Sequence, residues 1–222
     1  MDKNICILST RKLKSNQKQF LLNANFSVIE ADFINIEFLS FQIENHPTLL
    51  LFTSQNAVLS VLKNNKAEQL KSIPAICVGS KTKELLLDNG FEVLATTEYA
   101  KELAPIVQSD FSDKHIAFFA GNLRRDILPT AMIEANITFD EYRVYDNIET
   151  SIKINSQIDG LLFYSPSGVN SYLKNNTITH EMCFCIGTTT ADALKGITEN
   201  IIIANHQTID NVIVQCINYY KK

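Results

Sequence analysis

The chain of 222 residues lacks the sequence signatures of secreted, membrane-bound and nucleic-acid-binding proteins. No apolar run approaches the ~18 residues of a membrane-spanning helix. The N-terminal stretch MDKNICILSTRK has neither the apolar segment nor the cleavage site of a signal peptide. Acidic residues outnumber basic ones by 24 to 20, which argues against a nucleic-acid partner. We therefore expect a cytoplasmic protein that binds neither nucleic acid nor a membrane.

Motifs that bind metals, nucleotides or redox cofactors are missing as well. The five cysteines include no CxxC pair, and the four histidines are scattered without the spacing of metal ligands. No segment matches the phosphate-binding GxxxxGK[ST], the dinucleotide-binding GxGxxG or the nucleophile elbow GxSxG. We therefore expect a protein with reduced, buried thiols that needs no metal and no cofactor.

What the sequence does contain is an internal repeat. The stretch LLLFTSQNAV at 49–58 returns 111 residues later as GLLFYSPSGV at 160–169. An unbroken apolar run predicts a strand buried on both faces, and the serine after it predicts the N-cap of a helix. In the first copy the helical pattern starts at Ser54 and continues through a polar segment to Leu70.

The repeat extends over the whole chain as four segments in the order A, B, A′, B′. Segment A covers 4–33 and predicts two strands, and segment B, from 48 onward, predicts three; A′ and B′ are their copies at 115–145 and 158–217. One A and one B segment together make a five-stranded doubly wound sheet. We therefore predict an α/β protein with two similar parallel-sheet domains.

The repeat alone leaves open whether A pairs with B or with B′. Both crossings between segments, INIEFLSF and YDNIETSI, read as extended, so they can pair as a two-stranded connector. This favours the swapped arrangement, in which 1–34 and 151–222 form one domain, 41–143 form the other, and 35–40 and 144–150 form the connector.

Small polar residues follow five of the predicted strands, beginning with Thr10-Arg11. Ligands of open α/β sheets bind beyond the carboxyl ends of the strands, where helix N-termini offer N–H groups to phosphates or carboxylates. The alternative is that these loops are only caps and turns, and that Arg124-Arg125 is a solvated helix start. The predicted ligand-binding residues are Thr53, Ser54, Gln55, Gly79, Thr82, Gly121, Asn122, Arg125, Ser165, Ser167, Gly187, Thr189 and Thr190.

Six motifs occur in a fixed order: LFTSQNAV, VGSKT, GNLRRDILP, VYDN, FYSPSGV and IGTTTADAL. As a set they resemble the uroporphyrinogen-III synthase family over essentially the full length, and only TRK and 150–157 match loosely. The resemblance implies the swapped two-domain α/β fold. It also implies a cofactor-free lyase of heme biosynthesis that cyclises hydroxymethylbilane to uroporphyrinogen III, with loss of water and inversion of ring D.

The resemblance further implies a role for Tyr145, the tyrosine of the VY motif. It is the candidate catalytic residue, which would help the hydroxyl of the substrate to leave, while the serine and threonine loops would hold the substrate carboxylates. From its position at a crossing, Tyr145 either packs or faces a cleft between the domains. We expect a monomer with hydroxymethylbilane as its small-molecule substrate. The competing hypothesis is a non-enzymatic two-lobed binding protein for a small polyanion.

Overall fold

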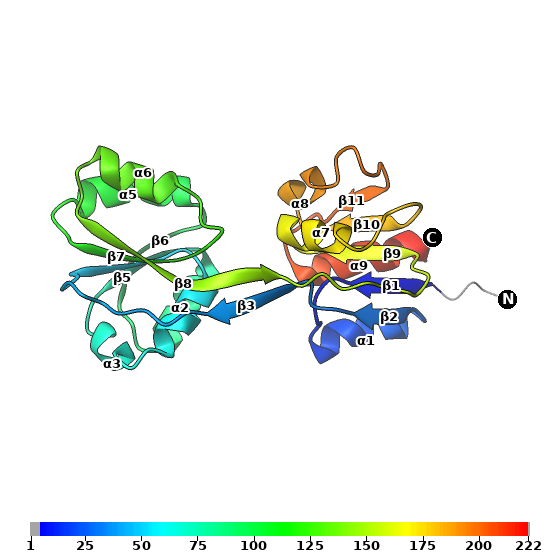
Figure 1. Ribbon diagram of the computed structural model, residues 1–222, viewed down its shortest axis with the longest axis horizontal. Helices are drawn as coiled ribbons and strands as arrows, with labels where there is room; N and C mark the ends of the chain where they lie inside the picture. Colours follow the sequence, from blue (N-terminus) through cyan, green and yellow to red (C-terminus); the bar gives the residue numbers. More distant parts are fainter. Residues whose placement is uncertain (1–4, 222) are drawn as a thin grey trace. The chain divides into compact units, whose positions relative to one another are not determined.

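The computed structural model describes residues 5–221, which form two compact units (Figure 1). The terminal unit consists of the chain before Ile36 and after Asn147, and the central unit is Ile36–Asn147. Each unit has its own sheet, covered by helices on both faces. The predicted α/β class with parallel sheets is therefore confirmed.

The sheet of the terminal unit has the strand order β11-β10-β9-β1-β2, and all neighbouring strands are parallel. Its middle is built from distant parts of the sequence, since Leu8 lies opposite both Ile29 and Leu161. Strand β1 thus has β2 and β9 as its neighbours. The strands are β1 (Cys6–Ser9), β2 (Ser27–Glu30), β9 (Gly160–Phe163), β10 (Met182–Cys185) and β11 (Ile201–Ile203).

Alternate residues of these strands face opposite layers of helices, as the two-residue period of a strand requires. Leu161 and Phe163 pack beneath α7 and α8, whereas Leu162 and Phe184 pack beneath α1 and α9. The four helices are α1 (Ser15–Asn23), α7 (Pro166–Leu173), α8 (Thr188–Asp192) and α9 (Ile209–Tyr220).

The sheet of the central unit has the order β3-β8-β7-β4-β5-β6. Strand β4 is fully buried between β7 and β5, with which it pairs in parallel. Leu51 and Phe118 face one helix layer, α5 and α6, whereas Phe52 and Phe119 face the other. The strands are β3 (Ile34–Phe38), β4 (Leu49–Phe52), β5 (Ala75–Val78), β6 (Val93–Thr97), β7 (Ile116–Gly121) and β8 (Phe139–Glu149); the helices are α2 (Gln55–Leu62), α3 (Ala67–Leu70), α4 (Ser80–Asp88), α5 (Ala100–Asp110) and α6 (Ile127–Glu134).

Strands β3 and β8 run along the two crossings of the chain and lie side by side (Figure 1). The Thr150 N–H donates to the Phe33 carbonyl and the Leu39 N–H donates to the Val144 carbonyl, both at 2.9 Å. The partner's number falls as the residue number rises, so this pair is antiparallel.

One sequence prediction is wrong in detail: the helix from Ser54 to Leu70 is two helices, α2 and α3. Asn64 interrupts it, because its side-chain carbonyl accepts from the Lys66 N–H at 2.9 Å and so replaces a helical bond with a local turn. The repeat is otherwise visible in the backbone. Asn25 and Asn136, which are 111 residues apart, both end a helix with positive φ, at 58° and 55°.

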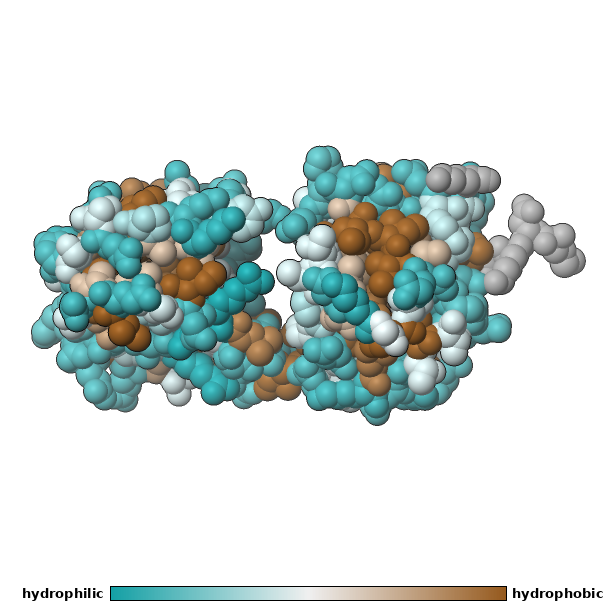
Figure 2. All heavy atoms as spheres, turned by 90° about the horizontal axis from the view of Figure 1, so that it is seen from above, coloured by the Kyte–Doolittle hydropathy of each residue, from teal (hydrophilic) through white to brown (hydrophobic). Residues whose placement is uncertain are grey.

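The surface carries no single large apolar face on the side seen in Figure 2. Apolar residues there form separate patches on each unit, set among hydrophilic side chains. Among the described helices, none is both long and apolar enough to cross a membrane.

Candidate functional site

The predicted catalytic residue, Tyr145, lies in the central unit where β8 runs beside the carboxyl end of β7. Its side chain is only 8% exposed. The Ser54 hydroxyl donates a hydrogen bond to the Tyr145 phenol oxygen at 2.9 Å and accepts one from the Ala57 N–H at 3.2 Å. Ser54 therefore caps α2, and its hydroxyl proton is used in the hydrogen bond to Tyr145. As a result, the proton of the Tyr145 phenol is free to be donated to another group.

Gly121 makes room for this tyrosine. The residue lies opposite Tyr145 across β7 and β8, just after a shift in the register of the two strands. A Cβ atom built on Gly121 would lie 2.4 Å from Cζ and 2.8 Å from the phenol oxygen of Tyr145. Any side chain at 121 would thus displace the ring. The sequence predicts Gly121 only as a ligand-binding residue, because its steric role depends on the pairing of β7 with β8.

A cavity of about 450 Å³ opens beside Tyr145. It combines hydroxyl, amide and guanidinium groups with an apolar wall, a mixture that suits an aromatic ligand with charged substituents. Its lining residues are Thr53, Ser54, Val78, Glu98, Tyr99, Ala100, Leu123, Arg124, Arg125, Leu128, Tyr145 and Asn147.

The two arginines of the cavity differ in their partners. Arg124 donates from Nε to Glu141 at 2.5 Å and also pairs with Asp126. These two carboxylates raise the pKa of Arg124, which stays positively charged, and they balance that charge. Arg125 is exposed and has no ion pair among residues 5–221. Arg125 is accordingly the guanidinium that can take up an anionic ligand, and Arg124 braces the loop.

Asn122 is engaged within the protein. Its side-chain carbonyl accepts from the Asn147 N–H at 2.9 Å, and its amide donates to the Asn147 carbonyl at 3.2 Å. These bonds tie the loop after β7 to β8 two residues beyond Tyr145. The side chain of Asn122 thus holds the loop that carries Arg125.

The structure brings only part of the predicted set of the central unit together. Thr53, Ser54, Arg125 and Tyr145 line the cavity. Buried Thr82 instead lies at the start of α4 beside Gly79, which has φ of 91°. Three other residues of the cavity, Tyr99, Leu123 and Asn147, were not predicted. Leu123 and Asn147 lie within the motifs GNLRRDILP and VYDN, but only the fold shows that they line the cavity beside Tyr145.

The terminal unit repeats the capping geometry. Ser165 accepts from the Gly168 N–H at 3.1 Å and lies 3.0 Å from the Ser167 hydroxyl. Gly187 is the N-cap of α8, in which Thr190 is buried and Thr189 is exposed. Both loops follow adjacent parallel strands, β9 and β10, so their N–H groups lie at the same edge of the sheet.

Metal and thiol chemistry find no support in the described part of the chain. Residues 5–221 contain no group of three or more His, Cys, Asp or Glu side chains that could hold a metal ion. Burial raises the pKa of Cys183 and of Cys185 to about 12, so both remain protonated thiols at neutral pH.

Comparisons with known proteins bear on the family and the fold of this chain. A profile of the family described as uroporphyrinogen-III synthase HemD matches residues 18–213. The crystal structure of the uroporphyrinogen-III synthetase from Helicobacter pylori has 18% sequence identity and a TM-score of 0.73, with 97% of this chain and 99% of that chain covered. A mutant uroporphyrinogen III synthase from Thermus thermophilus has 15% identity and a TM-score of 0.68, with 98% and 99% covered. At these identities the two structures show the fold alone. A search among curated protein sequences finds no significant match.

Proposed function

Since the chain belongs to the uroporphyrinogen-III synthase family of lyases, we propose that the Tyr145 site carries out the ring closure that defines this family. The substrate, hydroxymethylbilane, is a small linear tetrapyrrole of heme biosynthesis. It loses the hydroxyl of its terminal hydroxymethyl group as water, and the substituted carbon of ring D, at the other end of the chain, attacks the cation formed there. Ring D is inverted in the closed macrocycle, uroporphyrinogen III.

The observation that carries the proposal is the direction of the hydrogen bond between Ser54 and Tyr145. Because the Ser54 hydroxyl donates a hydrogen bond to the phenol oxygen, Tyr145 can donate its own proton to the departing hydroxyl as a general acid. The same hydrogen bond then stabilises the phenolate that is left behind. The phenolate regains a proton when the closed macrocycle loses one, so the net change is the loss of one water.

We propose that Arg125 and the helix N-termini hold the carboxylates of the substrate. Backbone N–H groups at a helix start are each worth about 0.3–1 kcal/mol toward an anion. The net charge of −4 argues against a strongly basic surface. Many such N–H groups together can bind a polyanion without one. We extend this role to the other predicted residues: Thr53, Gln55, Gly79, Thr82, Gly121 and Asn122 in the central unit, and Ser165, Ser167, Gly187, Thr189 and Thr190 in the terminal unit. Asn122 would act through its backbone N–H, because its side chain is bound to Asn147.

We also propose that the two compact units are the two domains of the enzyme, connected by 35–40 and 144–150. The enzyme works as a monomer in the cytoplasm, without a cofactor and without nucleic acid. The two-lobed binding protein is the less favoured alternative, because a family profile of enzymes matches most of the chain.

The test is an isomer analysis. Hydroxymethylbilane is generated in situ, and the products are oxidised and separated as uroporphyrins I and III. Without enzyme the substrate closes spontaneously to the type I isomer, and the protein should divert it to type III. If the protein is only a binding module, the type I product will remain unchanged.

A further inference from the structure

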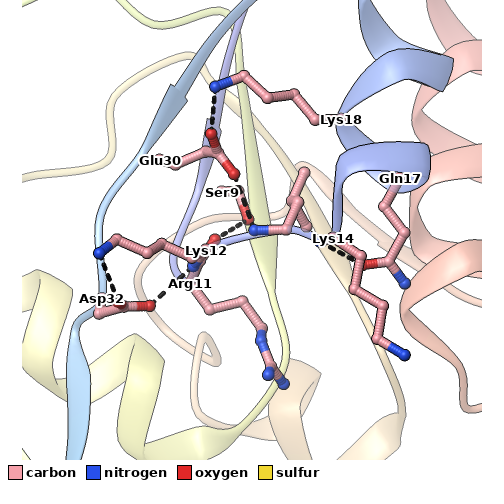
Figure 3. Close-up of polar contacts among 9 residues, drawn as sticks. Ser9, Arg11, Lys12, Lys14, Gln17, Lys18, Glu30 and Asp32 are labelled. Carbon is pink, nitrogen blue, oxygen red and sulfur yellow. Dashed lines mark hydrogen bonds and ion pairs between the residues drawn. The ribbon is translucent and has the colours of Figure 1, made fainter.

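The loop between β1 and α1 is rich in cations. Arg11, Lys12 and Lys14 follow one another closely, and Lys18 lies one turn into the helix (Figure 3). Two of these charges are already paired, since Lys12 lies 3.9 Å from the Asp32 carboxylate and Lys18 pairs with Glu30. Arg11 is exposed, and no carboxylate in residues 5–221 forms an ion pair with it.

The backbone of this loop is fixed at each step around Arg11. The Ser9 hydroxyl donates to the Arg11 carbonyl at 2.6 Å, the Lys12 N–H donates to Asp32 at 2.7 Å, and the Leu13 N–H donates to Glu30 at 2.8 Å. In Figure 3 the Arg11 side chain leaves the loop away from these contacts and carries no dashed line. The two carboxylates beside the loop, Glu30 and Asp32, thus bind its backbone and Lys12 and Lys18. The guanidinium of Arg11 is left for another partner.

Tyr164 forms the wall beside Arg11. The Arg11 guanidinium carbon lies 6.0 Å from the centre of the Tyr164 ring, and the Tyr164 hydroxyl is 3.1 Å from the Ser9 hydroxyl. Burial raises the pKa of Tyr164, so its phenol is neutral and is no counter-ion for Arg11. The ring can only orient the guanidinium, as aromatic faces do for arginine.

We propose that Arg11 binds a carboxylate side chain of the linear tetrapyrrole and that Tyr164 and Ser9 position it for this contact. The inference rests on the proposed function, because that function supplies a substrate with carboxylate substituents. Arginine suits the task, since its planar fork binds both oxygens of a carboxylate at once. Arg11 then gives the terminal unit a cationic side chain that binds a carboxylate, comparable with Arg125 in the central unit.

The experiment compares Arg11→Gln with Lys12→Gln. Both variants remove one positive charge from the same loop, but Lys12 already has Asp32 and its side chain is 81% exposed. We expect Arg11→Gln to raise KM for hydroxymethylbilane about tenfold while kcat and the type III product are kept. Arg11→Lys should recover part of the loss, and Lys12→Gln should keep the wild-type KM.

A binding measurement makes the test independent of turnover. Uroporphyrin III has the same carboxylates as the product and is fluorescent, so its Kd can be titrated for each variant. The Kd should rise in Arg11→Gln and stay unchanged in Lys12→Gln. Thermal unfolding checks that the exposed substitution leaves Tm unchanged, and Arg11→Lys, which keeps the charge, carries the test if Arg11→Gln does not fold.

Two results overturn the inference. One is an unchanged KM and Kd in Arg11→Gln, and the other is an equal shift in both glutamine variants, which would mean that only net charge matters. A failure of the proposed function looks different, because the wild-type protein would then yield only the type I isomer. Wild-type formation of type III with an unaffected Arg11→Gln variant rejects the role of Arg11 alone.

Discussion

The substitution Gly121→Ala tests whether the place of the Tyr145 ring controls catalysis. The added Cβ would lie 2.4 Å from Tyr145 Cζ, whereas ordinary contacts begin at 3.4 Å, so the ring has to move by about 1 Å. A shift of about 1 Å is larger than the stretch that a hydrogen bond of 2.9 Å tolerates, so we expect it to disrupt the bond between Ser54 and Tyr145. A displacement of this size at a catalytic group costs roughly 10²-fold in rate, and the crowding costs about 1–3 kcal/mol of stability.

The assay measures kcat for type III product and the free energy of unfolding of Gly121→Ala in denaturant. The control is a double-mutant cycle with Tyr145→Ala, which removes the ring that the new methyl group meets. In the Tyr145→Ala background, Gly121→Ala should cause no further loss of activity. Its loss of stability should be smaller than in the wild-type background. Wild-type kcat in Gly121→Ala would refute the reasoning, and so would an equal loss in both backgrounds, since either result means that Gly121 acts without Tyr145.

Three further predictions follow from the same contacts. Tyr145→Phe keeps the ring and removes the proton, so kcat should fall by roughly 10²–10⁴ with little change in KM; wild-type kcat in this variant, together with inactive Tyr145→Ala, would leave the ring as the only requirement. A chelator should leave activity intact, and a loss that one added metal restores would contradict the cofactor-free mechanism. Burial alone would raise the pKa of Glu30, but hydrogen bonds from Lys18 and the Leu13 N–H lower it below the ordinary value of 4.5. The stability from Glu30 is therefore complete above the ordinary glutamate pKa and is lost as the pH falls through the lowered one. Urea unfolding of Glu30→Gln and wild type should thus converge in acid, and a gap independent of pH would argue against an ionised Glu30.

The strands and caps could be predicted because their signals are local. The runs at 49–52 and 160–163 became the fully buried strands β4 and β9. The serine after each run caps its helix, with Ala57 and Gly168 as the N–H donors. Each strand and each helix start can be predicted separately, because the apolar periodicity and the capping residue lie within about ten residues of one another.

The contacts of the site could not be predicted in the same way. Ser54 and Tyr145 are 91 positions apart, and their hydrogen bond depends on the register shift between β7 and β8 at Gly121. The ring of Tyr164 reaches Arg11 only because β1 and β9 are neighbours. Contacts between residues so far apart in the sequence depend on tertiary packing. The repeat alone did not decide whether segment A packs with B or with B′.

The pairing of β1 with β9 has a consequence for synthesis of the protein. Ile7 lies opposite Gly160, so the strand that completes the middle of this sheet leaves the ribosome about 150 residues later. At a synthesis rate of about 5–20 residues per second, β1 waits for roughly 8–30 s. During that interval Ile36–Asn147 is already complete and can fold. The apolar edge of β1, meanwhile, is open to wrong partners on other nascent chains. In this chain the strand that is synthesised first is one of the last to be buried. The unpaired edge of β1 is therefore a surface to which a holding chaperone can bind.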